Sequence, residues 1–422
     1  MSDPGSPSNR PASPQGGSSH ETLHETRQTT VQAAQQTGEA GARFAVDTIR
    51  SIHDIEEARW DRFSDGSNPF LHHGFFRALE DTGCTTAGTG WQPHHLLFYL
   101  NDELAGVAPG YLKTHSMGEY VFDWAWADAY RRYGVDYYPK LLLAIPFTPS
   151  TGRRLMLSEA ARSALTPAVL HDLLNKAASD AGAHSWHLLF PDSADQALLD
   201  NPGTLHRLGC QFHWHNRGYR HFEDFLATLT SRKRKSIRRE RRQVQEQGID
   251  FVRFSGDRLP DPVLSAFYVF YQATYRKRGQ QPYLNRAFFA ALREQLGDRL
   301  QVVMAVRDRQ MIAGALFLRG GDTLYGRYWG CLEEFDHLHF ETCYYQGIEL
   351  AIASGCLRFD AGAQGEHKLI RGFEPVLTHS WHWVTHPGFR DALAEFCCEE
   401  ADQVRAYRDD AMTALPYRSD IA

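Results

Sequence analysis

Two stretches of the sequence lie 207 residues apart and match in both residues and predicted elements. Repeats at a constant offset indicate that one structural unit occurs twice in a chain. The match therefore constrains the fold more than any other feature of the sequence. Five identical pairs define the offset: Tyr137/Tyr344, Tyr138/Tyr345, Leu143/Leu350, Ala144/Ala351 and Ile145/Ile352.

Each copy predicts the same order of elements: a two-stranded hairpin, an aromatic-rich third strand, a helix and a further strand. A meander that leads into a helix and a parallel strand gives a mixed sheet covered by helices. We therefore predict an α/β (α+β) fold. The elements are 95–106, 120–126, a helix ending near Ile145 and 154–157 in the first copy, and 301–314, 324–329, a helix ending near Ile352 and 357–360 in the second.

The composition is that of a globular protein with real cores, since 42% of its 422 residues are hydrophobic and 12% aromatic. No run of eighteen apolar residues predicts a membrane span, and the N-terminus lacks a signal-peptide pattern. Seven cysteines without a C-x-x-C pair argue against disulfides and a zinc ribbon. We expect reduced thiols and a cytoplasmic protein.

One short segment carries most of the basic charge. Residues 231–242 hold eight basic side chains and one acidic one, a local charge of +7, whereas the whole chain has a net charge of −6. The rest of the chain is therefore acidic, which excludes a protein that is basic throughout. We expect no DNA partner.

This basic segment predicts a helix over residues 232–247, with Ser231 as N-cap and Gly248 as the stop. Ile237 and Val244 form one narrow apolar seam, so most charges point outward. The helix is either a solvated face or a site for phosphates of RNA or of a nucleotide- or lipid-linked substrate. The absence of aromatic residues argues against base stacking. The phosphate-binding candidates are Arg234, Arg238 and Arg239.

The repeated unit has the element order of a GNAT acyltransferase. Two such units with a basic helix between them resemble the FemAB-like group of bacterial proteins, which is associated with peptidoglycan biosynthesis or recognition. The resemblance covers about residues 45–390 and implies two tandem GNAT-like domains, each a mixed, mostly antiparallel sheet flanked by helices. It rests on N-P-F-L-H-H-G-F-F (68–76), G-E-Y-V-F-D-W-A-W (118–126), Y-Y-P-K-L-L (137–142), P-F-T-P-S-T-G-R-R-L (146–155), R-K-R-K-S-I-R-R-E-R (232–241), H-F-E-T-C-Y-Y (339–345) and F-D-A-G-A-Q-G-E-H-K (359–368).

We divide the chain into five parts. They are a disordered N-terminal segment (1–43), a first GNAT-like domain (44–218), a connecting basic helix (219–249), a second GNAT-like domain (250–388) and a C-terminal helix (389–422) that packs on the second domain.

The acyl donor depends on the loop before the central helix, where GNAT enzymes that use acetyl-CoA have Q/R-x-x-G-x-G/A. The second copy has no glycine at 332–340 and carries three carboxylates there, which would repel a pyrophosphate. This departure favours an aminoacyl-tRNA donor, used by Fem peptidoglycan-bridge enzymes, over acyl-CoA. No tightly bound cofactor is expected. The first copy has a partial match, with Arg131, Arg132 and Lys140 as phosphate candidates or as parts of an exposed loop.

Candidate chemistry gathers at residues 358–368, where a core strand leads into a glycine-rich bend. Amine acylation needs a base, oxyanion donors and positioning, without a covalent enzyme intermediate. The alternative is a charged surface turn. The candidates are Asp360 and Glu366 as bases, His367 as proton carrier, Lys368 and Arg371 as a clamp for a carboxylate or phosphate, and Tyr328 as acid for the leaving group.

In the first copy, Asp123 and Trp126 are predicted on opposite faces of a strand, where they either bind a sugar or peptide or belong to the core. Closely spaced histidine pairs, such as His213 and His215, lack a third ligand at a telling distance, so no metal is expected.

The leading hypothesis is an acyl- or aminoacyl-transferase that forms an amide on an amine of an anionic acceptor. A peptidoglycan precursor is the candidate acceptor and aminoacyl-tRNA the candidate donor, with tRNA as a possible partner. The alternatives are an acetyl-CoA-dependent N-acetyltransferase of a small amine, and a recognition protein that binds a phosphate-rich ligand through its basic helix without catalysis.

Overall fold

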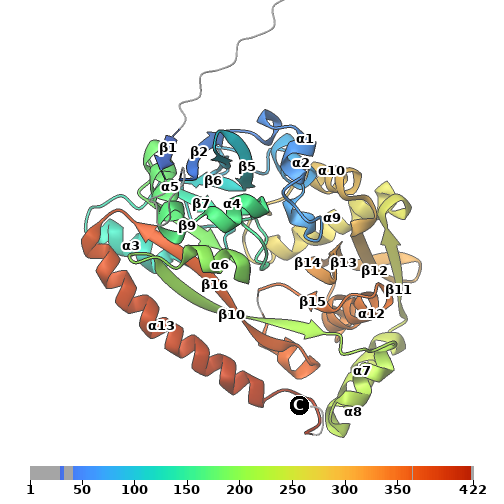
Figure 1. Cartoon of the computed structure of the whole chain (residues 1–422). Coiled ribbons are helices and arrows are strands. Elements are labelled where there is room, and N and C mark those ends of the chain that lie inside the picture. Colours follow the sequence, from blue (N-terminus) through green and yellow to red (C-terminus); the bar gives the residue numbers. More distant parts are fainter. Residues whose placement is uncertain (1–28, 33–40, 364, 420–422) are drawn as a thin grey trace, which may run out of the picture.

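The computed structural model describes residues 29–32, 41–363 and 365–419 (Figure 1). Most of the segment predicted to be disordered lies outside these residues. One part of that prediction is wrong, because Thr29–Gln32 forms strand β1 and pairs antiparallel with β2 (Arg43–Ile49). The sequence Thr-Thr-Val-Gln is rich in β-branched residues, which favour strands.

The described strands form two sheets, a five-stranded one in the first half of the chain and an eleven-stranded one that runs through both halves (Figure 1). The small sheet has the order β1, β2, β4 (His95–Leu100), β5 (Glu103–Ala108) and β8 (Met156–Leu157). The large sheet has the order β11 (Ile249–Ser255), β12 (Leu300–Arg307), β13 (Gln310–Gly320), β14 (Thr323–Cys331), β15 (Arg358–Asp360), β10 (Leu205–His215), β16 (Glu374–Val384), β9 (Ser185–Leu189), β7 (Lys140–Leu143), β6 (Gly110–Lys113) and β3 (Trp91–Pro93).

The second half has the predicted element order. Strands β12, β13 and β14 are antiparallel, and β14 pairs parallel with β15 after a helical segment. That segment consists of α11 (Leu338–Phe340), a π-helical turn (Glu341–Tyr345) and α12 (Gln346–Ala353). The parallel pairing ends at Tyr325 and Asp360, so the two strands separate there and β14 continues with β13 as its neighbour.

The first half differs from the element order that the repeat predicts. Residues 124–132 form helix α3 instead of continuing a strand, because their alanines favour a helix and Trp126 and Tyr130 bury one face. Lys140–Leu143 forms strand β7 instead of a helix, because this short apolar run is buried on both faces of the sheet. The last predicted strand is present as β8 but pairs antiparallel with β5.

Helices cover both halves, and none in the described part of the chain is long and apolar enough to cross a membrane. The α-helices not yet given are α1 (Glu57–Asp61), α2 (His73–Asp81), α4 (Glu159–Ala164), α5 (Pro167–Asp180), α6 (Ser193–Leu199), α7 (Phe222–Thr228), α8 (Ser231–Glu246), α9 (Asp261–Arg276), α10 (Arg286–Leu296) and α13 (Pro387–Thr413).

The C-terminal helix α13 lies along β10 and β16 rather than on the second half alone (Figure 1). The ring of Phe389 stacks on that of Tyr130 in α3, with 3.8 Å between the centroids. Arg207 of β10 donates two hydrogen bonds to Glu400 of this helix. Helix α13 directly follows β16 in the chain. Since β16 lies between β10 and β9, the helix begins beside the first half.

The two halves also share a core. Phe70 packs edge-on against Tyr325 with 5.1 Å between the ring centroids, and Phe75 packs against Phe288 at 6.1 Å. These rings belong to the largest hydrophobic cluster, which contains residues from both halves. The point where β14 and β15 separate therefore lies beside the junction of the halves.

Candidate functional site

Asp360 lies at the point where β14 and β15 separate. One of its carboxylate oxygens lies 2.9 Å from Arg327 Nη2, and the other accepts a hydrogen bond of 2.9 Å from the Gly362 N–H. His213 Nε2 lies 3.8 Å from the same carboxylate. Although burial raises the pKa of Asp360, Arg327 and the other partners hold it well below its usual range. An ionised carboxylate engaged in this way is a weak base, so its geometry fits an anchor better than a general base.

Lys368 is buried beside this ion pair. Its Nζ donates a hydrogen bond of 2.6 Å to the Gly362 carbonyl oxygen. Burial lowers the pKa of Lys368 to about 8, which the neighbouring Asp360 counteracts only in part. The side chain belongs to a 3-10 segment, Glu366–Arg371, which begins and ends at glycines with positive φ. The bend therefore presents a buried cation next to the separated strands.

His367 lies half-buried in a cluster of rings. Its Nε2 lies 2.8 Å from the Tyr344 hydroxyl, and its ring centroid is 5.8 Å from that of His339. Burial, together with Arg371 and Lys368, lowers the pKa of His367. The pKa of His339 falls to about 4 for similar reasons. Both imidazoles are therefore neutral near pH 7.

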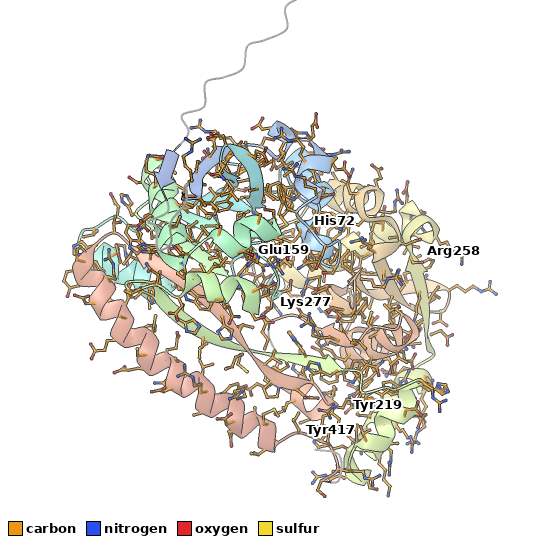
Figure 2. The ribbon with its side chains drawn as sticks, viewed as in Figure 1. His72, Glu159, Tyr219, Arg258, Lys277 and Tyr417 are labelled. Atoms are coloured by element: carbon orange, nitrogen blue, oxygen red, sulfur yellow. The ribbon has the colours of Figure 1, made fainter. Side chains whose placement is uncertain are left out.

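A cavity of about 420 Å³ opens next to these rings, at the end of β14. Trp329, Leu338 and His339 line it on one side, and Lys277 and Arg278, which follow α9, on the other. Lys277 Nζ lies 2.9 Å from a Glu334 carboxylate oxygen. Lys277 is labelled near the middle of Figure 2, between the two halves. The cavity therefore reaches His339, whose ring lies 5.8 Å from that of His367.

The other predicted members of the site are Arg371, Glu366 and Tyr328. Arg371 is buried and bonded, since Nη2 lies 2.9 Å from a Glu240 oxygen and Nε lies 3.0 Å from the Tyr345 hydroxyl. Glu366 is exposed and accepts a hydrogen bond from Tyr407. Tyr328 packs with rings of α9 and α10, on the face of β14 opposite to Trp329. The structure therefore places Asp360, His367 and Lys368 at one bend, where Arg371 also bonds to the His367 carbonyl oxygen, but it does not place Glu366 or Tyr328 there.

The first half contains a second buried cluster of charges. Lys140 Nζ lies 2.8 Å from Glu119 Oε2 and 3.0 Å from Ser116 Oγ, and it also bonds to the Asp123 carboxylate. The Tyr137 hydroxyl donates a hydrogen bond of 2.6 Å to Asp123. Lys140 and both carboxylates are almost fully buried. The cluster therefore fixes the loop before α3 to strand β7.

The partial phosphate loop of the first half is not assembled. Lys140 lies in the buried cluster, whereas Arg131 and Arg132 are exposed and pair with Asp128. Trp126 is buried and packs edge-on against His382, with 5.0 Å between the ring centroids. Since residues 124–132 form a helix, the predicted alternation of Asp123 and Trp126 along a strand is wrong.

The basic helix is present as α8 (Ser231–Glu246), but the predicted N-cap is wrong, because Ser231 is the first helical residue and Thr230 is the N-cap. Ile237, Val244 and Glu240 are its buried residues. Arg238 pairs with Glu223, while Arg234 is half-buried and Arg239 exposed without an ion pair in the described part of the chain. These positions leave several cations free for an anionic ligand.

A family model described as peptidoglycan biosynthesis/recognition and named FemAB-like matches residues 51–419. The chain belongs to the FemAB-like family. No curated protein matches this FemAB-like chain in sequence.

One solved structure, that of FemX, confirms the fold of this FemAB-like protein. The crystal structure of FemX is similar with a TM-score of 0.51 and 13% identity, and the match covers 82% of this chain and all of that one. The C-terminal domain of a putative lysylphosphatidylglycerol synthetase from Agrobacterium fabrum has a TM-score of 0.49 at 10% identity, covering 83% and 97% of the two chains. A tandem GNAT protein from the clavulanic acid biosynthesis pathway has a TM-score of 0.42 at 10% identity, covering 81% and 99%.

Sequence reasoning missed several members of the two clusters. Arg327 is the ion-pair partner of Asp360, and His213 comes from β10, more than a hundred residues earlier in the chain. Arg327 is a charged residue in the middle of an aromatic-rich strand. Because a buried charge needs a partner, this position indicates an ion pair. By contrast, no local sequence pattern indicates that Glu119 pairs with Lys140, because the tertiary fold brings them together.

Proposed function

We propose that this FemAB-like protein is an N-acyltransferase that forms an amide on an amine of an anionic acceptor, at the point where β14 and β15 separate. The observation that carries the proposal is the position of Lys368, a buried cation bonded to Gly362 and adjacent to the Arg327–Asp360 pair. A fixed cation in a water-poor site stabilises the oxyanion that forms during acyl transfer. The Arg327–Asp360 pair would hold the bend in place.

In this mechanism His367 accepts the proton of the attacking ammonium. Its neutral form near pH 7 and its hydrogen bond to Tyr344 support that role. The amine nitrogen bonds to the acyl carbon, the bond from that carbon to the leaving oxygen or sulfur breaks, and the leaving atom receives a proton. Tyr328 was predicted as that acid, but its position on the opposite face of β14 gives this assignment no support.

The charge of the loop before α11 favours aminoacyl-tRNA over acyl-CoA as the donor. Glu333 and Asp336 are exposed there and would repel a pyrophosphate, and Glu334 is bonded to Lys277. An ester at the end of an RNA needs no pyrophosphate subsite at this helix. Its acyl group would enter through the cavity beside His339.

The family description supports a peptidoglycan precursor as the acceptor, and a reaction with aminoacyl-tRNA would take place in the cytoplasm. Among the predicted phosphate ligands, Arg234 is the one on the side of α8 that faces the protein. We assign it to the phosphates of the acceptor. Asp123, Trp126, Arg131 and Arg132 would then serve the structure of the first half.

The test is transfer to a nucleotide-linked peptidoglycan precursor, measured by mass spectrometry with charged tRNA and with acetyl-CoA in separate reactions. Transfer from charged tRNA supports the proposal, and transfer from acetyl-CoA alone would establish the N-acetyltransferase alternative. Binding of the precursor without transfer from either donor would establish a recognition protein. We expect Lys368→Met to lower kcat at least 100-fold with little change in KM, whereas Lys176→Met, on the exposed face of α5, leaves both unchanged.

A further inference from the structure

The outer face of helix α8 carries a line of basic side chains. Arg232, Lys235, Arg239 and Arg242 are all exposed. In the described part of the chain, the first three have no ion pair or hydrogen bond from the side chain, and Arg242 lies 3.5 Å from Glu246 with both side chains well exposed. Figure 1 shows α8 at the edge of the molecule, so this face is open to a ligand.

The spacing of these residues places them on one stripe. They are separated by three, four and three positions, the spacing at which helical side chains lie above one another. The stripe is about 15 Å long at 1.5 Å per residue. The opposite face holds Ile237 and Val244, which are buried. The stripe therefore points away from the protein and from the bend that carries Lys368.

The chemistry of the stripe fits a polyanion better than a lipid surface. No apolar side chain lies between these cations on the outer face, since the apolar residues of α8 are buried. A helix that lies in a membrane interface needs an exposed apolar face. No aromatic side chain is present for base stacking. What remains is attraction to phosphates spaced along a backbone.

The inner face of α8 connects the stripe to the candidate active site. Buried Glu240 lies 2.9 Å from Arg371 Nη2, and Arg371 Nη1 donates a hydrogen bond of 2.8 Å to the carbonyl oxygen of His367. A ligand on the outer face is therefore held at a fixed position relative to His367 and Lys368. A long donor could bind there while its end reaches the cavity.

We propose that Arg232, Lys235, Arg239 and Arg242 bind the phosphate backbone of an RNA, without reading its bases. The identity of that RNA as the acyl-carrying tRNA rests on the proposed function. The binding surface itself does not, because it follows from the free cations of α8.

The experiment measures binding of deacylated tRNA to the full chain at several salt concentrations. Four phosphate contacts predict a log–log salt slope of roughly −3 to −4. Changing all four residues to glutamine keeps the helix propensity, and we expect at least a tenfold weaker binding at low salt and a slope near zero. The matched control removes four exposed arginines elsewhere and should leave both quantities unchanged; it consists of Arg50→Gln, Arg59→Gln, Arg258→Gln and Arg309→Gln.

Equal binding by the α8 variant and the wild type, or equal loss in the control, would overturn the proposal. So would wild-type binding to phosphatidylglycerol vesicles, lost in the α8 variant, without any binding of tRNA. Circular dichroism verifies that each variant is folded. Amide formation is followed separately: if no donor is used but tRNA binding depends on α8, the proposed function fails and the RNA surface stands.

Discussion

Arg371 Nη2 lies 2.9 Å from a carboxylate oxygen of Glu240, and this buried pair fastens the bend around Lys368 to the basic helix. The Tyr345 hydroxyl lies 2.5 Å from the same carboxylate and 3.0 Å from Arg371 Nε. Removal of one member leaves a buried charge without its partner, which is more costly than the pair is stabilising.

Glu240→Gln should therefore lower the free energy of unfolding by about 3 kcal/mol, because the guanidinium of Arg371 stays buried without a counter-charge. Urea denaturation followed by circular dichroism measures this change. Glu246→Gln on the same helix is the control, since Glu246 is exposed and its substitution should change stability by less than about 0.5 kcal/mol. Equal changes in the free energy of unfolding for the two substitutions would show that the buried pair does not stabilise the fold more than an exposed one.

Lys368 gives a pH dependence of activity. Its pKa is lowered to about 8 by burial, so the ammonium form is lost as pH rises through that value. If this cation stabilises the oxyanion, kcat should fall above pH 8, and Lys368→Arg, whose charge persists, should lack this fall at a lower maximal rate. A wild-type rate that rises through pH 9 would instead indicate that Lys368 acts as a neutral amine.

The buried cluster of the first half predicts a large effect of Lys140→Met. The substitution leaves the carboxylates of Glu119 and Asp123 buried without their main cation, so we expect a loss of about 3 to 5 kcal/mol in the free energy of unfolding. Lys176→Met in α5 is the control, because that lysine is exposed and pairs with the likewise exposed Asp180. A loss below about 1 kcal/mol for Lys140→Met would contradict the cluster's structural role.

A histidine pair predicts a stability that depends on pH. His187 Nδ1 lies 2.7 Å from His382 Nδ1, and each ring bonds to a serine through Nε2. Burial and Lys140 lower the pKa of His187 to about 3. The folded state thus favours the neutral ring, and its contribution is complete above about pH 6.5 and is lost as pH falls towards 3.

Below pH 6.5, the free energy of unfolding should fall by about 1.4 kcal/mol per pH unit for each proton that binds on unfolding. The double substitution His187→Asn and His382→Asn should reduce the wild-type slope between pH 6.5 and 4.5, measured by denaturation at each pH. His53→Asn, at an exposed site paired with Asp81, should leave the slope as it is. If stability falls with pH equally steeply in all three proteins, His187 and His382 do not cause the loss of stability in acid.

Elements with strong local patterns were predicted from the sequence. The charged helix α8 is confirmed because Ile237 and Val244 give it a single apolar seam. The meander of the second half is confirmed because its apolar runs are separated by short polar turns at 308–309 and 321–322. The C-terminal helix α13 is also present, because its apolar residues recur at helical spacing. Its predicted packing on the second domain alone is wrong, since its contacts with β10 and β16 depend on where β16 pairs rather than on local sequence.

The repeat was partly misleading for the first half. The five identical residues all have aromatic or aliphatic side chains, which suit a buried helix and a buried strand equally well. In the site, the position of Asp360 at a strand end was readable from the sequence, but its partners Arg327 and His213 come from other strands. Pairings of this kind are set by the register of the sheet, which single residues do not reveal.

The place of β16 between β9 and β10 has a consequence for synthesis of the protein. When the ribosome has made residues 1–218, the strand that joins β9 to β10 does not yet exist, because it comprises residues 374–384. The early part of the chain must therefore wait, with both strand edges unpaired, until most of the later part has emerged. Unpaired edges of this kind invite wrong pairing, and the large sheet is complete only after β16 has been inserted between β9 and β10.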